Sequence, residues 1–131
     1  MIVVDASAIV DSLVDQPPAA GLLAVLADTP LHAPTLVDFE VASALRGHAL
    51  GRRLDQSRLD EAVADFRSLR VERHPMSDLL DHLLELRHRF TVYDAAYVVL
   101  ARALEAPLVT CDAKLRAASE VGVHVRLFRG G

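Results

Sequence analysis

Few of the residues that build disulfides and zinc sites occur in this sequence. It has one cysteine, Cys111, among 131 residues, which excludes an internal disulfide and a zinc site made of several cysteines. Of the six histidines, the two nearest in sequence are His82 and His88, which lie six residues apart and would occupy different faces of a helix. Spacing along the chain therefore gives no reason to expect a zinc site.

Long apolar runs are also absent. No segment approaches the roughly 20 apolar residues that span a membrane, and the N-terminal MIVVDASAIV lacks the basic stretch that begins a signal peptide. The composition, 52% apolar and 24% charged with no internal repeat or long linker, is typical of a globular protein. We expect a single domain over residues 1–131 that does not contact the membrane and works in the cytoplasm.

The sequence has no excess of positive charge. A formal charge of −4 and a pI of about 5.8 argue against a generic surface for polyanions. The distribution weakens this argument, because setting aside four carboxylates discussed below leaves 14 acidic side chains against 14 basic ones. Thirteen of those bases are arginine, whose guanidinium suits bidentate phosphate contacts. The composition is therefore compatible with a nucleic-acid substrate.

The apolar pattern predicts strands that alternate with helices. Short apolar runs indicate strands at residues 2–4, 31–33, 71–74, 107–110 and 123–128, the last at a sheet edge. Helices are predicted at residues 6–14, 19–27, 55–69, 77–89 and 114–121, with a further one that begins after a capping Thr35 and ends near Leu50, and a helix apolar on every side around residues 95–101. This order predicts an α/β fold with a mostly parallel central sheet.

Two aspartates stand at the ends of predicted strands. Asp5 follows the first strand, and Asp112 follows the strand at 107–110. Ligands of open parallel sheets bind outside the carboxyl ends of the strands, so both side chains are expected to face one crevice. Asp94 stands at the entrance of the enclosed helix, although Thr91-x-x-Asp94 also fits a capping box.

A fourth acid comes from the helix that ends near Leu50. Glu40 lies at the border of the apolar stripe that should face the sheet. Asp38 borders the other edge of the same stripe almost equally well, so spacing alone leaves both open.

Carboxylates brought together repel each other, and burial raises the cost of each charge, so such a cluster needs protons or cations to neutralise it. Ligands that are all oxygen favour Mg²⁺ or Mn²⁺ over softer metals. Divalent ions held in this way can stabilise the attacking and leaving oxygens of phosphoryl chemistry. The combination, rather than any single acid, predicts metal-assisted hydrolysis of phosphodiesters.

These residues resemble the PIN-domain family, and more closely the VapC ribonuclease toxins of bacterial and archaeal toxin–antitoxin pairs. The resemblance covers essentially the whole chain, with matching segments IVVDASAIV (Asp5), FEVASAL (Glu40), TVYDAAYVVLA (Asp94) and LVTCDAKL (Asp112) in the family's order and spacing. It implies a three-layer α/β/α fold, a Mg²⁺ or Mn²⁺ site made by these four acids, and endonucleolytic cleavage of RNA. It also favours Glu40 over Asp38.

The resemblance implies roles and partners as well. Asp5, Asp94 and Asp112 would bind metal directly, while Glu40 would act partly through water, orienting or deprotonating the attacking molecule. Some relatives carry a further acid where this chain has Lys114, which could contact a phosphate instead, so a second metal is in question. The implied partners are an RNA substrate, a VapB-like antitoxin and a second copy of the chain.

Three further residues border the proposed site. Ser7 and Thr110 are given supporting roles, because their hydroxyls could hydrogen-bond a carboxylate or a bound water, although local capping fits them equally well. Tyr97, inside the enclosed helix, is expected to be a core residue with its hydroxyl hydrogen-bonded.

Two other functions are compatible with parts of the pattern. A receiver-like phosphoacceptor domain also combines a parallel sheet, an acidic Mg²⁺ pocket and a nearby lysine, but its acids should be paired near the end of the first strand. A non-catalytic RNA- or protein-binding module would use the acids only for folding and capping.

Overall fold

A parallel sheet forms the centre of the protein. The computed structural model describes residues 1–129. Within them one sheet contains β1 (Ile2–Val4), β2 (Leu31–Pro34), β3 (Val71–His74), β4 (Leu108–Thr110) and β5 (Val125–Leu127). The strand order is β3-β2-β1-β4-β5, and every pairing is parallel. The predicted parallel sheet is therefore confirmed, with β5 at one edge and β3 at the other.

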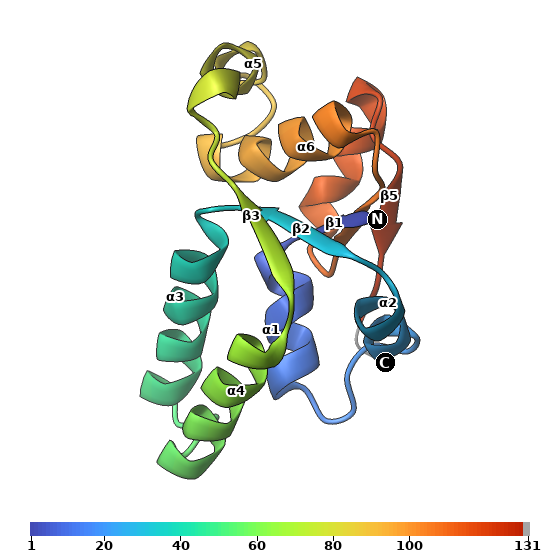
Figure 1. Ribbon diagram of the computed structural model, residues 1–131. Coiled ribbons are helices and arrows are strands. Elements are labelled where there is room, and N and C mark those ends of the chain that lie inside the picture. Colours follow the sequence, from blue (N-terminus) through green and yellow to red (C-terminus); the bar gives the residue numbers. More distant parts are fainter. Residues whose placement is uncertain (130–131) are drawn as a thin grey trace.

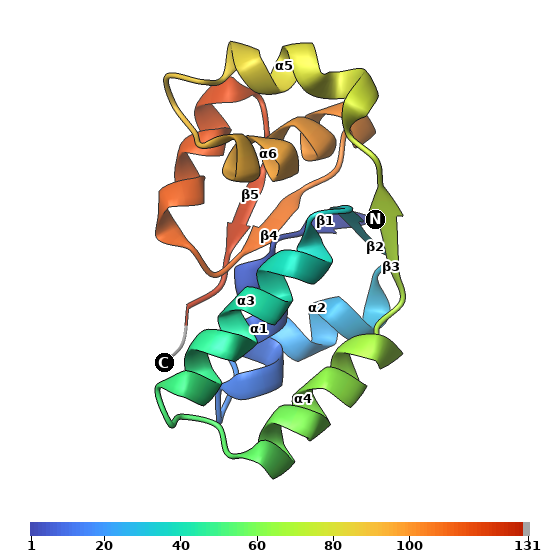
Figure 2. The ribbon, with the colours of Figure 1, turned by 90° about the vertical axis from the view of Figure 1, so that its left-hand side faces the viewer.

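Helices cover both faces of the sheet (Figures 1 and 2). On one face lie α1 (Ala6–Val14), α2 (Leu22–Asp28), α3 (Val37–Leu50) and α4 (Gln56–Ser68); on the other lie η1 (Ser77–Leu79), α5 (Leu80–Glu85), α6 (Val92–Leu104) and η2 (Ala113–Val121), where η marks a 3-10 helix. This arrangement is the expected three-layer α/β/α fold.

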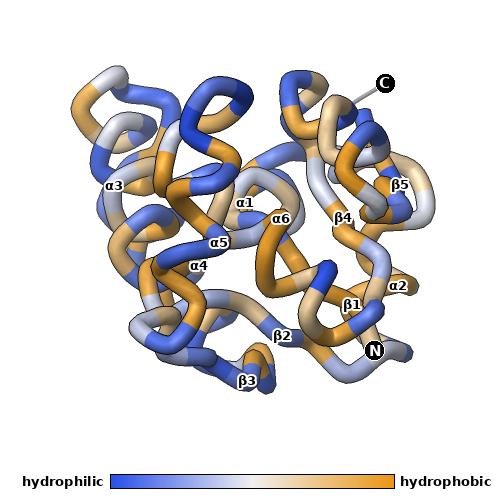
Figure 3. Tube along the Cα trace, turned by 90° about the horizontal axis from the view of Figure 1, so that it is seen from above, coloured by the Kyte–Doolittle hydropathy of each residue, from blue (hydrophilic) through white to orange (hydrophobic). Residues whose placement is uncertain are grey.

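The core lies where α6 packs against the middle of the sheet. Residues 95–101 of α6 are all buried, as are all residues of β1 and β4. Because both faces of these strands are covered, their sequences are continuous apolar runs rather than alternating ones. Figure 3 shows this concentration of apolar segments in α6, β1 and β4. Within the described residues no helix combines the length and the apolar character needed to cross a membrane.

The N-terminus of α6 is fixed by a side-chain cap. Thr91 Oγ1 accepts a hydrogen bond of 3.1 Å from the backbone N–H of Asp94, which is half of the predicted capping box. The carboxylate of Asp94 does not complete the box; it is directed to another partner, described below. The cap therefore positions Asp94 in the first turn of α6 and leaves its side chain free for a different role.

Three predicted helices differ from the structure. Thr35 is not the cap of α3, because the cap position is Leu36 and no side chain caps this helix. The backbone N–H of Thr35 donates to His74 O at 3.1 Å, at the end of the sheet. The helix predicted at 77–89 is η1 followed by α5 and ends at Glu85. The segment at 114–121 belongs to η2, a 3-10 helix that begins at Ala113.

The 3-10 form of η2 has a reason in its sequence. Leu115 and Ala118 are fully buried, and Val121 packs against the same core. These residues are spaced by three, and side chains three apart are aligned in a 3-10 helix but not in an α-helix. Gly122 ends η2 with a left-handed φ of 87°, directly after the predicted range.

Candidate active site

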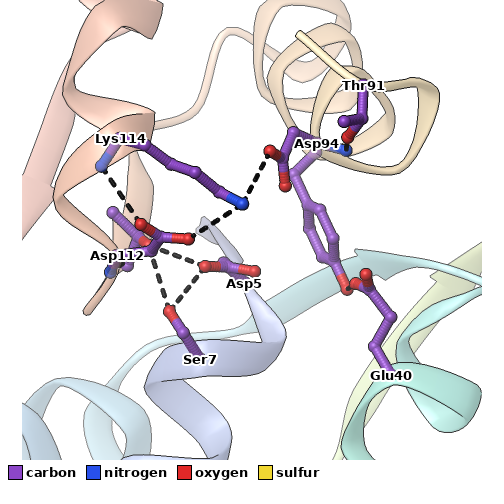
Figure 4. Close-up of polar contacts among 9 residues, drawn as sticks. Asp5, Ser7, Glu40, Thr91, Asp94, Asp112 and Lys114 are labelled. Carbon is purple, nitrogen blue, oxygen red and sulfur yellow. Dashed lines mark hydrogen bonds and ion pairs between the residues drawn. The ribbon is translucent and has the colours of Figure 1, made fainter. Parts of the chain in front are cut away.

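A cleft of about 500 Å³ opens beside the ends of β1 and β4. Asp5, Glu40, Asp94 and Asp112 all line this cleft, together with Ser7 and Lys114. The four acids come from the end of β1, from α3, from the first turn of α6 and from the loop after β4 (Figure 4). Residues more than 100 positions apart in sequence are thus brought together, as the parallel topology predicts.

Asp5 is the most buried of the four acids, with 6% of its surface exposed. Ser7 Oγ and Thr110 Oγ1 each donate a hydrogen bond of 2.6 Å to Asp5 Oδ2. Burial raises the pKa of Asp5 above its ordinary value; the two hydroxyl bonds oppose this rise, and the negative charge of Asp112 adds to it. The negative charge of Asp5 is therefore destabilised by burial, and a nearby cation would stabilise it.

The two hydroxyls also hold the ends of β1 and β4 in a fixed relation. Ser7 Oγ accepts from the backbone N–H of Cys111 at 3.0 Å, and Thr110 Oγ1 accepts from the N–H of Asp112 at 3.0 Å. Each hydroxyl thus acts as both donor and acceptor. The bond that Thr110 accepts is local, whereas the bond that Ser7 accepts joins residues 104 positions apart. The network orients Asp5 relative to Asp112.

Glu40 is held by a residue from the core. The hydroxyl of the fully buried Tyr97 donates to Glu40 Oε1 at 2.6 Å. Burial raises the pKa of Glu40, the Tyr97 hydrogen bond opposes this, and the charges of Asp5 and Asp94 raise it further. Burial also raises the pKa of Tyr97, so its hydroxyl keeps its proton and acts as a donor. Tyr97 is the expected core residue, but its partner in the site could not be read from the sequence.

Asp38, the alternative to Glu40, lies elsewhere. Its carboxylate pairs with the guanidinium of Arg73, with a shortest distance of 2.7 Å, and it does not line the cleft. The geometry therefore favours Glu40 over Asp38, as the resemblance did.

Lys114, the only lysine of the sequence, lies between two of the acids. Its Nζ is 3.3 Å from Asp94 Oδ2 and 3.5 Å from Asp112 Oδ2 (Figure 4). The hydrogen bond to Asp94 and the charges of both acids raise the pKa of Lys114. The ammonium group thus pairs with two acids, and its single positive charge offsets only one of their two negative charges.

This donor set fits a hard divalent ion. Four carboxylates converge on one cleft, and the side chains of Asp94 and Asp112 are only 17% and 34% exposed. The acids already gather one cation, the ammonium of Lys114, between two of them. Carboxylate oxygens are the ligands that Mg²⁺ and Mn²⁺ prefer.

Sequence reasoning gave no site role to four other ionisable residues that line the cleft: Asp11, Asp15, His48 and Cys111. Helical spacing could have predicted two of them. Asp11 lies four residues after Ser7, and His48 lies eight residues after Glu40, so each shares a helix face with a site residue. Asp11 Oδ2 accepts from the backbone N–H of Ala19 at 2.9 Å, and its hydrogen bond with Asp15 raises the pKa of Asp15. Asp11 therefore also fixes the turn after α1.

Similarity to known proteins identifies the family of this chain. A model of the PIN domain matches residues 2–121. This chain belongs to the PIN-domain family. Ribonuclease VapC9 of Mycobacterium tuberculosis is 43% identical over 115 residues, covering 88% of each chain, and ribonuclease VapC1 of the same species is 38% identical over 129 residues, covering 97% of each. Within the PIN domains, the chain therefore belongs with the VapC ribonucleases.

Two solved structures share its fold. PAE2754 from Pyrobaculum aerophilum superimposes with a TM-score of 0.67 at 25% identity, covering 95% of this chain and 87% of that protein. A structure of FitAB bound to a DNA fragment gives a TM-score of 0.59 at 18% identity, covering 97% and 94%. The three-layer architecture thus persists at low sequence identity.

Proposed function

We propose that this protein is a divalent-metal-dependent endoribonuclease that acts as the toxin of a toxin–antitoxin pair. The observation that carries the proposal is the convergence of Asp5, Glu40, Asp94 and Asp112 on one cleft. The similarity to VapC ribonucleases supports RNA as the substrate. The reaction is hydrolysis: water bonds to phosphorus while the bond to the leaving oxygen breaks.

The acids divide into two roles in this proposal. Asp5, Asp94 and Asp112 would hold Mg²⁺ or Mn²⁺, and Glu40 would contribute partly through water. The bound ion supplies the positive charge that polarises the scissile phosphate and stabilises charge on the reacting oxygens. Ser7 and Thr110 keep the Asp5 carboxylate oriented, because both donate to Asp5 Oδ2.

Glu40 is suited to accept a proton. Its pKa is raised by burial, which brings it nearer to the working pH than that of a free glutamate. The hydrogen bond from Tyr97 occupies Oε1 and fixes the orientation of the carboxylate. We therefore assign proton transfer from the attacking water to Oε2.

Arginine supplies positive charge at the rim of the cleft. Arg53 Nε donates to His48 Nδ1 at 3.0 Å, and His48 lines the cleft. Burial, followed by the charge of Arg53, lowers the pKa of His48, so the imidazole stays neutral and accepts this bond. We propose that the guanidinium of Arg53 contacts a phosphate of the RNA next to the cleaved one.

Exposed apolar side chains beside the site acids support protein partners. Phe39 is 79% exposed next to Glu40, and Val92 and Tyr93 are 48% and 65% exposed just before Asp94. We propose that a VapB-like antitoxin and a second copy of the chain cover such residues in the cytoplasm. Light scattering of the antitoxin-free protein should give the mass of two 14.2 kDa chains.

Cleavage of RNA by the purified, antitoxin-free chain tests the function. We expect cleavage with Mg²⁺ or Mn²⁺ and none with excess chelator. Asp5→Asn and Asp94→Asn should each abolish it, whereas Asp28→Asn, a change of the same kind at an exposed residue of α2, should not. Cleavage that persists in chelator or in both site variants would refute the proposal.

The same experiment separates the alternatives. A non-catalytic binding module would bind RNA without cleaving it under any metal condition. The receiver-like alternative loses its support, because the matching family is the PIN domain.

A further inference from the structure

A second cluster of metal-ligating side chains lies on the sheet and shares no residue with the cleft. It consists of His32 on β2 and Glu72 and His74 on the edge strand β3. His32 is the register partner of Glu72, and His74 is two residues further along β3, so all three point to the same face of the sheet. One potential ligand atom from each lies within 4.8 Å of the others.

The separations are close to those of a bound transition metal. His32 Nδ1 is 2.8 Å from His74 Nε2 and 3.5 Å from Glu72 Oε2. Ligand atoms around a tetrahedral zinc ion, with bonds near 2.1 Å, lie about 3.4 Å apart. The 3.5 Å separation matches this value. The 2.8 Å separation requires the two imidazole nitrogens to move apart by only about 0.6 Å. A rotation of the His74 ring, at a sheet edge, would provide this.

The pairing of the two imidazoles is itself informative. Two ring nitrogens that face each other share one proton, since a neutral imidazole has one donor and one acceptor nitrogen. A metal ion in place of that proton would bond to both nitrogens as lone-pair donors. Two imidazoles and one carboxylate form a donor set that favours zinc and its neighbours over Mg²⁺.

We propose that His32, Glu72 and His74 bind one transition-metal ion of the zinc type. The His32 side chain is 13% exposed and that of Glu72 is 68% exposed, so the ion would enter from the side of Glu72. Three protein ligands leave a fourth position for water. Sequence spacing could not predict this site, because His32 and His74 are 42 residues apart and meet only through the β2–β3 pairing.

The position of the site gives it a structural consequence. Among the strands that the structure describes, β3 pairs with β2 alone. An ion held by His32 on one side and by Glu72 and His74 on the other links these two strands. Metal binding should therefore raise the melting temperature of the protein and protect the amides of β3 from hydrogen exchange.

The test uses tag-free, full-length protein in which Asp5→Asn and Asp94→Asn weaken metal binding in the cleft. We expect titration with Co²⁺ to give the visible absorption of a four- or five-coordinate ion at one equivalent, and Zn²⁺ to displace it. Because the background protein has lost the proposed nuclease site, this result does not depend on whether the chain cuts RNA.

Ligand variants in the same background decide the assignment. His74→Ala should weaken Zn²⁺ binding by about 100-fold or more, and Glu72→Ala by at least about 10-fold. The matched control is His82→Ala, which removes an exposed histidine that has a carboxylate, Glu85, at 3.5 Å but no second imidazole. It should bind Zn²⁺ like the parent.

Because Glu72 is exposed, its variant should fold even if His74→Ala does not, and it keeps the proposal open to refutation. Absence of a stoichiometric Co²⁺ spectrum would overturn the proposal. Zn²⁺ binding that is unchanged in Glu72→Ala would also overturn it. So would a His82→Ala variant that weakens Zn²⁺ binding as much as the ligand variants do.

Discussion

The hydroxyl of Tyr97 donates a 2.6 Å hydrogen bond to Glu40 Oε1 and so joins the buried centre of α6 to the carboxylate cleft. Tyr97 is fully buried, so its ring has no freedom to follow a moving Glu40. Glu40 is thereby held by a rigid element rather than by its own helix alone. This makes Tyr97 a positioning residue for the proposed proton acceptor.

Tyr97→Phe should lower the rate of RNA cleavage by about 10-fold, the effect of losing roughly 1.4 kcal/mol of interaction. The Tyr97 bond lowers the pKa of Glu40, so its loss should raise that pKa further. Activity that needs ionised Glu40 would then decline at a higher pH as the solution is acidified. A pH–rate profile of kcat checks both expectations.

The control is Tyr93→Phe, which removes a hydroxyl from a tyrosine that is 65% exposed. It should leave both the rate and the pH profile unchanged. A Tyr97→Phe profile that overlays the parent at every pH would show that Tyr97 serves only packing.

Asp5→Asn should stabilise the metal-free protein. Because burial raises the pKa of folded Asp5, the folded chain retains a proton at pH values where the unfolded chain has lost it. Stability in chelator therefore falls as pH rises above the ordinary aspartate value of 3.8, and asparagine avoids this loss. At pH 7 we expect the melting temperature to rise by a few degrees, which corresponds to a gain in unfolding free energy on the order of 1 kcal/mol.

Excess Mn²⁺ should reverse the order of the two melting temperatures, because it stabilises only the parent, which binds it. Thermal melts of the parent and of Asp5→Asn, each with chelator and with Mn²⁺, give the four melting temperatures needed. Asp28→Asn, at an exposed position of α2, should change none of them. A metal-free Asp5→Asn protein that melts below the parent would contradict the argument.

Much of this site could be predicted because chain topology fixes it. Once strands are parallel, Asp5 and Asp112 must meet at one edge, since both follow strands that are neighbours in the sheet. Asp94 was located by its position at the start of an enclosed helix. These relations depend on residue order alone, which a sequence contains.

Contacts that depend on side-chain reach could not be predicted. The sequence gives no sign that Tyr97 faces Glu40, or that Lys114 lies between Asp94 and Asp112. A helix was predicted at residues 114–121, but not its 3-10 form. Thr35 was predicted as the cap of α3 from its residue type, whereas the cap position is Leu36 and no side chain caps the helix.

Lys114→Met should increase the affinity for Mn²⁺ in the absence of RNA. The ammonium of Lys114 competes with a divalent ion for Asp94 and Asp112. Exposed ion pairs are worth about 0.2–1 kcal/mol each, so losing two of them predicts a Kd that is lower by about 2- to 30-fold. Isothermal titration calorimetry measures this directly.

Arg116→Met removes the same charge from an exposed position two residues away and isolates the effect of contact from that of net charge. It should change the Kd for Mn²⁺ much less. If both variants bind Mn²⁺ equally well, general charge rather than competition at the carboxylates determines the affinity.

Thr110→Val should weaken Mn²⁺ binding and destabilise the protein. Valine keeps the shape of the fully buried threonine but removes the donor to Asp5 and the acceptor for the backbone N–H of Asp112. A buried group left without its partner costs about 1–3 kcal/mol, which we expect as the loss in unfolding free energy. Denaturant unfolding in chelator measures the loss, and Thr29→Val at a half-buried position after α2 is the control.

Cys111 should be inert to thiol reagents despite lining the cleft. Burial, with smaller effects from the charges of Asp11, Asp5 and Asp15, raises the pKa of Cys111 to about 12. Since the thiolate is the reactive form, a rise from 9.0 to about 12 lowers its population at pH 8 by about 1000-fold. Iodoacetamide should therefore label the folded protein far more slowly than the same chain in guanidinium, as followed by mass spectrometry. Because burial is the largest cause, Asp11→Asn should speed the folded reaction only slightly, whereas a folded rate close to the unfolded one would mean that the thiol is not held in an apolar environment.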